Sequence, residues 1–136
     1  MNYHKMIYDD LHIHHLNQPF VIYNIDHHHD LGYSDNNNFT QDNQINLNSG
    51  NWVNKIYSEY GDQFEQYIWI KNENSDHVSL IDGLSYPEWE ETETLLPFQT
   101  IKWDKVYLCS SFAWIPPYIR PLFHDLVTLI EKNIKK

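Results

Sequence analysis

Residues 20–30 read FVIYNIDHHHD, and this stretch decides the fold that the sequence predicts. Its first six residues are largely apolar, with β-branched and aromatic side chains, and Pro19 precedes them. Such a run is typical of a central strand that is covered on both faces in a parallel sheet. An acid, three histidines and a second acid follow directly. These polar residues would lie at the carboxyl end of the strand, where open α/β sheets bind their ligands.

The polar residues after this run have a spacing that suits a metal ion. Alternate side chains of an extended segment share a face. Asp26, His28 and Asp30 are therefore expected to point one way, and His27 and His29 the other way. Two carboxylates and one imidazole suit Mn²⁺, Fe²⁺ or Zn²⁺ better than Ca²⁺. The three residues are thus predicted metal ligands and, in an enzyme, catalytic residues; the alternative is a polar turn whose histidines and aspartates hydrogen-bond one another.

The rest of the chain predicts strands that alternate with helices. Helices are predicted within residues 2–18, 49–61 (with Asn51 as cap and Gly61 as stop) and 116–136, strands within 64–72, 77–86 and 105–111, a long surface loop at 32–50, and a loop or helical turn at 88–99. This alternation predicts an α/β fold, a small three-layer domain with a mostly parallel sheet. A length of 136 residues suits one domain over residues 1–136 and is too short for two.

The composition excludes several functional classes. The net charge is -10, with 19 acidic and nine basic residues, so direct binding to nucleic acid or to anionic membranes is not expected. The start of the chain does not resemble a signal peptide, and no apolar stretch is long enough to cross a membrane. A single cysteine suits the reducing cytoplasm, which is the predicted location. The acidic surface could attract metal cations, mimic a nucleic acid toward a basic protein partner, or simply maintain solubility.

The segment FVIYNIDHHHD resembles the first metal-binding segment of the arginase and deacetylase superfamily. There, an apolar strand ends in Asp, any residue, His, any residue, Asp, and the last Asp is typical of the arginase-like branch. Residues 50–70 and 105–127 are similar to further segments of small arginase-like proteins, including ones of phage origin. The resemblance implies an arginase-like fold and a divalent metal, Mn²⁺ before Zn²⁺ or Fe²⁺. It also implies a metal-assisted hydrolase that cleaves a C–N bond of a small-molecule substrate.

Two departures from the arginase pattern keep a second hypothesis open. Arginases supply a second acidic pair from a later strand end, whereas the corresponding segment here, CSSFAWIPP at residues 109–117, has no acid. The chain is also much shorter than a full arginase domain. A mononuclear or degenerate site is therefore favoured over a dinuclear one. The second hypothesis is a non-catalytic binding protein whose acidic surface engages a protein partner, for example a phage protein that blocks a host system.

Other histidines and a second motif complete the candidates. His4, His12 and His77 are candidates for an additional ligand or for a hydrogen-bond partner of the ligating imidazole. Asp26, His27 and His28 also form the motif that names the DHH phosphoesterases. That family needs earlier aspartates on a preceding strand-loop unit, and the 25 residues before this motif are too few for such a unit and its helix. The phosphoesterase hypothesis is therefore disfavoured.

Overall fold

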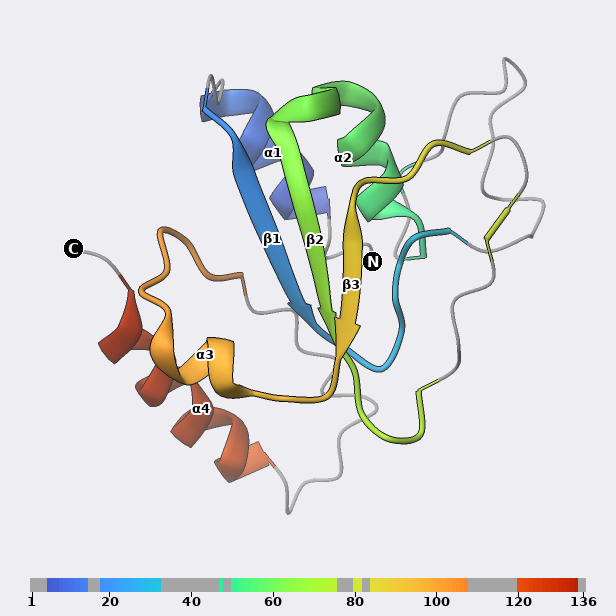
Figure 1. The fold of residues 1–136 in the computed structure, drawn as a ribbon. Coiled ribbons are helices and arrows are strands. Elements are labelled where there is room, and N and C mark those ends of the chain that lie inside the picture. Colours follow the sequence, from blue (N-terminus) through green and yellow to red (C-terminus); the bar gives the residue numbers. More distant parts are fainter. Residues whose placement is uncertain are drawn as a thin grey trace. The chain divides into compact units, whose positions relative to one another are not determined.

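The computed structural model describes residues 5–14, 18–32, 47, 50–75, 80–81, 84–107 and 120–134, and Figure 1 shows its elements. The chain divides into two compact units, Met1–Thr94 and Leu95–Lys136, and each is described by itself. The single domain over residues 1–136 therefore stays a prediction. Among the described residues, no helix combines the length and the apolar composition that a membrane span requires.

The first unit is built on a parallel sheet of three strands. Its elements are α1 (Lys5–His14), β1 (Phe20–Ile25), α2 (Trp52–Tyr60), the 3-10 turn η1 (Gly61–Gln63), β2 (Phe64–Ile70) and β3 (Trp89–Thr92). The strands lie side by side in the order β1-β2-β3 and run in the same direction (Figure 1). Parallel neighbours need a crossover connection, and α2 lies within the one that joins β1 to β2. The described residues thus form a small α/β fold with a parallel sheet, as predicted.

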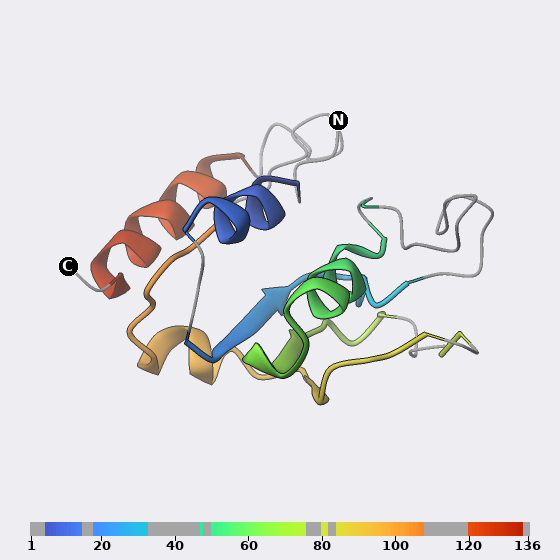
Figure 2. The same cartoon turned by 90° about the horizontal axis from the view of Figure 1, so that it is seen from above.

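The central strand of the described sheet is β2, and its residues form much of the core. Its buried side chains are Phe64, Tyr67, Ile68, Trp69 and Ile70. Helix α2 packs on one face of this strand, where the ring of Trp52 meets Tyr67 edge-on at 6.4 Å and that of Tyr57 meets Phe64 at 6.3 Å. Figure 2 shows the same elements from above. Helix α2 is therefore held against the sheet by aromatic contacts with β2, in addition to its covalent connection to the strands.

Strand β1 differs from its prediction. The apolar run was expected to form a central strand with both faces covered, but among the described strands β1 lies at an edge. Val21 and Ile25 are 40% and 49% exposed. An apolar, β-branched run shows that side chains suit a pleated surface, but it does not show which neighbours cover them. The strand itself was therefore predicted correctly, and its central place in the described sheet was wrong.

The third strand of the described sheet forms in a segment that was predicted as a loop or helical turn. Residues 77–79 and 82–83 of the strand predicted at 77–86 lie outside the described residues, so that strand stays a prediction, and the acidic segment that follows forms β3. Two backbone bonds frame its pairing with β2, from the Tyr67 N–H to the Glu88 carbonyl (2.8 Å) and from the Lys71 N–H to the Thr92 carbonyl (2.8 Å). Lys71 also pairs with the Glu91 carboxylate at 3.1 Å. Tertiary pairing therefore overrides the weak strand preference of acidic residues.

The limits of α2 were predicted well, although one of its caps differs. Asn51 makes no side-chain capping bond, so its predicted capping role is wrong. Gly61 ends the helix as predicted, with a φ of 54° and a ψ of -128°, and its N–H donates to the Tyr57 carbonyl. A residue with a side chain adopts this conformation only under strain. Gly61 is therefore required for the turn from α2 into η1.

The second unit contains α3 (Leu96–Thr100) and α4 (Arg120–Asn133). Helix α4 confirms the predicted final helix, and its Ile130 side chain is buried. The ammonium of Lys102 donates to the Lys132 carbonyl near the end of α4, at 3.3 Å. Of the strand predicted at 105–111, residues 105–107 are described and form no strand, and the remainder lies outside the described residues.

Replacement of Gly61 by alanine tests the end of α2. A Cβ at this position would meet no atom within 4 Å, so the cost comes from the backbone conformation alone. We expect Gly61→Ala to lower the free energy of unfolding by about 1–3 kcal/mol, measured by urea denaturation. The exposed neighbour Asp62 provides the control, and an Asp62→Ala variant of equal instability would contradict this explanation.

Candidate functional site

The candidate site begins where β1 ends, at the carboxyl edge of the sheet (Figure 1). The Asp26 N–H still bonds across to the Ile70 carbonyl at 3.2 Å, but residues 26–28 then bend away from the sheet. Asp30 has a φ of 56°, in the left-handed region. The segment after Asp26 is therefore not extended, and the alternation that was used to group Asp26, His28 and Asp30 does not hold there.

Asp30 is the buried centre of this turn, with 3% of its surface exposed. The indole N–H of Trp52 donates to its Oδ2 at 2.7 Å. The side chains of Asp26 and Asn24 also hydrogen-bond the Asp30 carboxyl. We name Asp26 and Asp30 the carboxyl pair. The turn brings these two acids together although they are four residues apart.

The environment of Asp30 keeps its carboxyl protonated at neutral pH. Burial raises the pKa of Asp30 to about 8, the negative charge of Asp26 adds to the rise, and the bond from Trp52 opposes it. Two carboxyl groups in contact cannot both be charged at low cost in a buried site. Asp30 is therefore the member of the carboxyl pair that holds a proton at neutral pH.

Two aromatic residues of β2 hold the backbone of the turn. The hydroxyl of Tyr67 donates to the His29 carbonyl at 2.6 Å and accepts a bond from the Asn24 amide at 3.0 Å. The indole N–H of Trp69 donates to the Asp26 carbonyl at 2.9 Å. Both ends of the turn are thus bonded to the central strand, so the carbonyls that leave the sheet ladder remain satisfied.

The first turn of α2 holds the following residues. The side-chain amide of Asn54 donates to the Leu31 carbonyl at 2.5 Å, and the Gly32 N–H donates to the Gly50 carbonyl at 2.9 Å. Asn54 and Leu31 are fully buried. Together with the bond from Trp52, these contacts tie the start of α2 to the carboxyl pair.

His29 is a buried, neutral histidine. Its Nδ1 accepts the Leu31 N–H at 2.9 Å, so the proton of the neutral ring lies on Nε2. Its ring meets Trp69 edge-on at 5.6 Å. Burial lowers the pKa of His29, the positive charge of nearby His28 lowers it further, and Glu91 opposes the change. His29 is therefore a buried packing residue of the turn. The alternation of side chains also placed it on the face opposite to the predicted ligands.

The other two histidines of the cluster are exposed. The His27 Nδ1 lies 3.1 Å from the Asn72 amide nitrogen and 3.5 Å from the Ser75 hydroxyl, in the loop after β2. The His28 backbone N–H donates to Asp26 Oδ1 at 3.3 Å. The rings of His27 and His28 meet edge-on at 4.8 Å. His28 is thus bonded to the carboxyl pair through its backbone, and its ring reaches the surface.

The predicted ligands are only partly brought together. Asp26 and Asp30 are adjacent, and the ring of His28 is exposed. Across the described ranges, no group of three or more His, Cys, Asp or Glu side chains is arranged to hold a metal ion. His4 and His77 lie outside the described residues. The metal site therefore stays a prediction.

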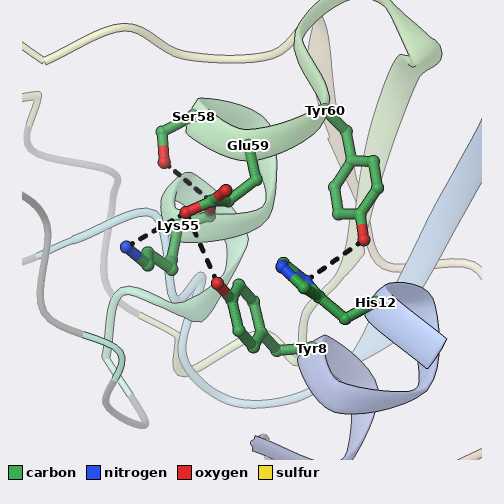
Figure 3. A network of polar contacts seen from close by, with 6 residues as sticks. All are labelled: Tyr8, His12, Lys55, Ser58, Glu59 and Tyr60. Carbon is green, nitrogen blue, oxygen red and sulfur yellow. Dashed lines mark hydrogen bonds and ion pairs between the residues drawn. The ribbon is translucent and has the colours of Figure 1, made fainter. Parts of the chain in front are cut away.

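His12 lies away from the carboxyl pair, between α1 and α2 (Figure 3). Its Nδ1 is 3.4 Å from the Tyr60 hydroxyl, and its ring lies 4.7 Å from that of Tyr8. Tyr8 in turn donates to the Glu59 carboxylate at 3.4 Å. The ring of Tyr60 also contacts Phe20, the first residue of β1. His12 is therefore near the amino end of the strand, whereas the carboxyl pair is at the other end.

Sequence reasoning missed the residues that support the carboxyl pair. They are Asn24, Trp52, Asn54, Tyr67 and Trp69. One signal was available, because Asn24 interrupts an apolar run two residues before Asp26, on the same face of the strand. The tryptophans offered a further signal, because a buried indole N–H usually needs an acceptor.

Comparisons with known proteins give no family for this chain. A scan against models of protein families finds no match, and neither curated proteins nor solved structures give a significant one. The arginase-like fold therefore stays a prediction that depends on the segments quoted above.

Loss of the Tyr67 hydroxyl should destabilise the turn. We expect Tyr67→Phe to lower the free energy of unfolding by about 1–3 kcal/mol, because the buried His29 carbonyl and the Asn24 amide lose their partner. Urea denaturation measures the effect. Tyr57→Phe is the matched control, since Tyr57 contacts the same helix-sheet interface through its ring. Equal losses in the two variants would contradict the role of the Tyr67 hydroxyl.

The raised pKa of Asp30 predicts how stability depends on pH. The carboxyl of Asp30 has a pKa of 3.8 in the unfolded chain and a pKa of about 8 in the fold, so between these values the folded state binds more protons. Stability from this group is complete below pH 3.8 and falls as pH rises to about 8. The lowered pKa of His29 acts in the opposite direction, but only below the ordinary histidine pKa of 6.5.

The measurement is therefore made above pH 6.5 in the presence of a chelator. Between pH 6.5 and 8 we expect the free energy of unfolding to fall by up to about 1.4 kcal/mol per pH unit, which corresponds to one proton. The Asp30→Asn variant should lose this slope, because asparagine has no carboxyl group to titrate. The variant is expected to keep the turn, since asparagine tolerates the left-handed backbone. Identical slopes in the variant and the unchanged protein would show that Asp30 does not carry the proton.

Proposed function

We propose that the protein binds a divalent metal ion through the carboxyl pair, with Mn²⁺ preferred over Zn²⁺ or Fe²⁺. One observation carries the proposal: Asp26 and Asp30 are hydrogen-bonded to each other in a turn at the carboxyl edge of a parallel sheet, where burial raises the pKa of Asp30 and favours its proton. A divalent cation in place of that proton would remove the repulsion between two carboxylates. Carboxylate oxygens suit Mn²⁺ well.

His28 is the proposed third ligand. The spacing of the sequence predicts it, and a neutral imidazole binds Mn²⁺, Fe²⁺ and Zn²⁺. Its backbone N–H already bonds Asp26, and its exposed ring is able to change rotamer within nanoseconds. The donor set of two carboxylates and one imidazole would leave positions open for substrate.

For the metal-bound site we propose hydrolysis of a C–N bond in a small-molecule substrate in the cytoplasm. The resemblance of residues 20–30 to the arginase-like segment supports this reaction class. A bound divalent ion would supply hydroxide at neutral pH. The contribution of the chain is to hold Asp26 and Asp30 together and to keep Asp30 away from bulk water.

A non-catalytic binding protein is the second candidate. A specific observation favours it, because Asp30 is almost fully buried and bonded to Trp52, as a purely structural carboxyl would be. The carboxyl pair would then only close the turn. The net charge of -10 would serve to engage a basic protein partner.

Titration with Mn²⁺ separates the two candidates. We expect the chelator-treated full chain to bind Mn²⁺ in isothermal titration calorimetry. Asp26→Asn and Asp30→Asn should weaken binding by at least about 100-fold, and His28→Ala should weaken it by about 10–100-fold. The adjacent exposed residue provides the control, since His27→Ala should bind like the unchanged protein.

The same titration should release a proton. Because Asp30 holds a proton below about pH 8, Mn²⁺ affinity should increase from about pH 6.5 to pH 8. Repeating the titration in buffers of different ionisation enthalpy gives the number of protons released. We expect up to one proton for each ion bound. The absence of binding of Mn²⁺, Zn²⁺ and Fe²⁺ to the unchanged protein would exclude the metal proposal and favour the binding protein.

A further inference from the structure

Trp52 occupies a special place between α2 and the carboxyl pair. It is the first residue of α2, 1% of its surface is exposed, and its indole N–H donates to Asp30 Oδ2 at 2.7 Å. The ring is fixed by its edge-on contact with Tyr67 at 6.4 Å. Asn54, in the first turn of the same helix, bonds the Leu31 carbonyl. The position of this donor is therefore set by the fold and not by the Asp30 carboxyl.

We propose that Trp52 is the positioning residue of the metal site, which holds the Asp30 carboxyl in the orientation that faces Asp26. This inference rests on the proposed metal function and deepens it. Donors that bond a ligating carboxylate orient it, and their loss usually costs affinity for the ion. The indole N–H can only donate, so it always takes a lone pair of Asp30 Oδ2 and leaves the other oxygen for its neighbour.

The position of Trp52 also links the site to α2. The start of this helix and the turn at residues 30–32 are joined by bonds from Trp52, Asn54 and Gly32. A change in the orientation of the Asp30 carboxyl would therefore reach the indole N–H directly. Its magnetic resonance should respond when an ion binds.

A second tryptophan provides a matched comparison. Trp69 is also buried, and its indole N–H also donates one bond to the turn, at 2.9 Å. Its acceptor is the backbone carbonyl of Asp26, whereas the acceptor of Trp52 is a ligand carboxyl. Phenylalanine at either position replaces a buried indole ring by a phenyl ring and so removes one hydrogen-bond donor. A general loss of structure would affect both variants, and a loss of positioning would affect Trp52→Phe alone.

The test is calorimetric titration of the full chain with Mn²⁺. We expect Trp52→Phe to weaken binding by about 10–100-fold and Trp69→Phe to change it much less. Unchanged binding in Trp52→Phe, or an equal loss in the two variants, would overturn the inference and leave the metal function intact. Absence of binding in the unchanged protein would instead remove the metal function itself.

A measurement on the unchanged protein covers the case in which Trp52→Phe does not fold. The indole N–H resonances of the ¹⁵N-labelled protein are followed during titration with diamagnetic Zn²⁺. We expect the Trp52 resonance to shift with the bound fraction and to shift more than that of Trp69. A Trp52 resonance that stays in place while Zn²⁺ binds would overturn the inference.

Discussion

The structure around the candidate site depends on one constraint, which is the burial of the Asp30 carboxyl in a left-handed turn. A buried carboxylate without partners is strongly unfavourable. Here the group receives hydrogen bonds from Trp52 and Asn24, it is hydrogen-bonded to Asp26, and its pKa is raised by burial so that it keeps a proton. Asn24 belongs to β1 and Trp52 to α2, so these partners come from the two elements that flank the turn. The turn is therefore bonded to the start of α2, the helix of the first crossover.

The crossover explains why these partners meet. A helix that joins two parallel strands begins near the carboxyl edge of the sheet and ends near the amino edge. The first residue of α2 therefore lies beside the end of β1, where Trp52 reaches Asp30. The next strand supplies Tyr67 and Trp69 to the same edge. The elements that close the sheet thus also form the site, and a ligand there would be coupled to the start of α2.

Most elements of the fold could be predicted because their apolar patterns are local. The run at residues 20–25, the pattern of α2 up to Gly61 and the aromatic strand β2 all follow from side-chain type and spacing. Strand β3 could not be predicted in this way. Its residues are acidic, and they form a strand because the backbone of β2 offers partners and Lys71 pairs with Glu91. Such partners are distant in the sequence.

The sequence by itself determined that an apolar strand is followed by acids and histidines at the edge of an α/β sheet. It did not determine which of these side chains meet, because alternation applies only while the backbone remains extended. The tertiary structure decided that Asp26 and Asp30 form a pair, that His29 is buried and that the ring of His28 is exposed. The physical reason is that the left-handed backbone of Asp30 ends the extended conformation, and its buried carboxyl depends on partners such as the indole N–H of Trp52, which is distant in the sequence.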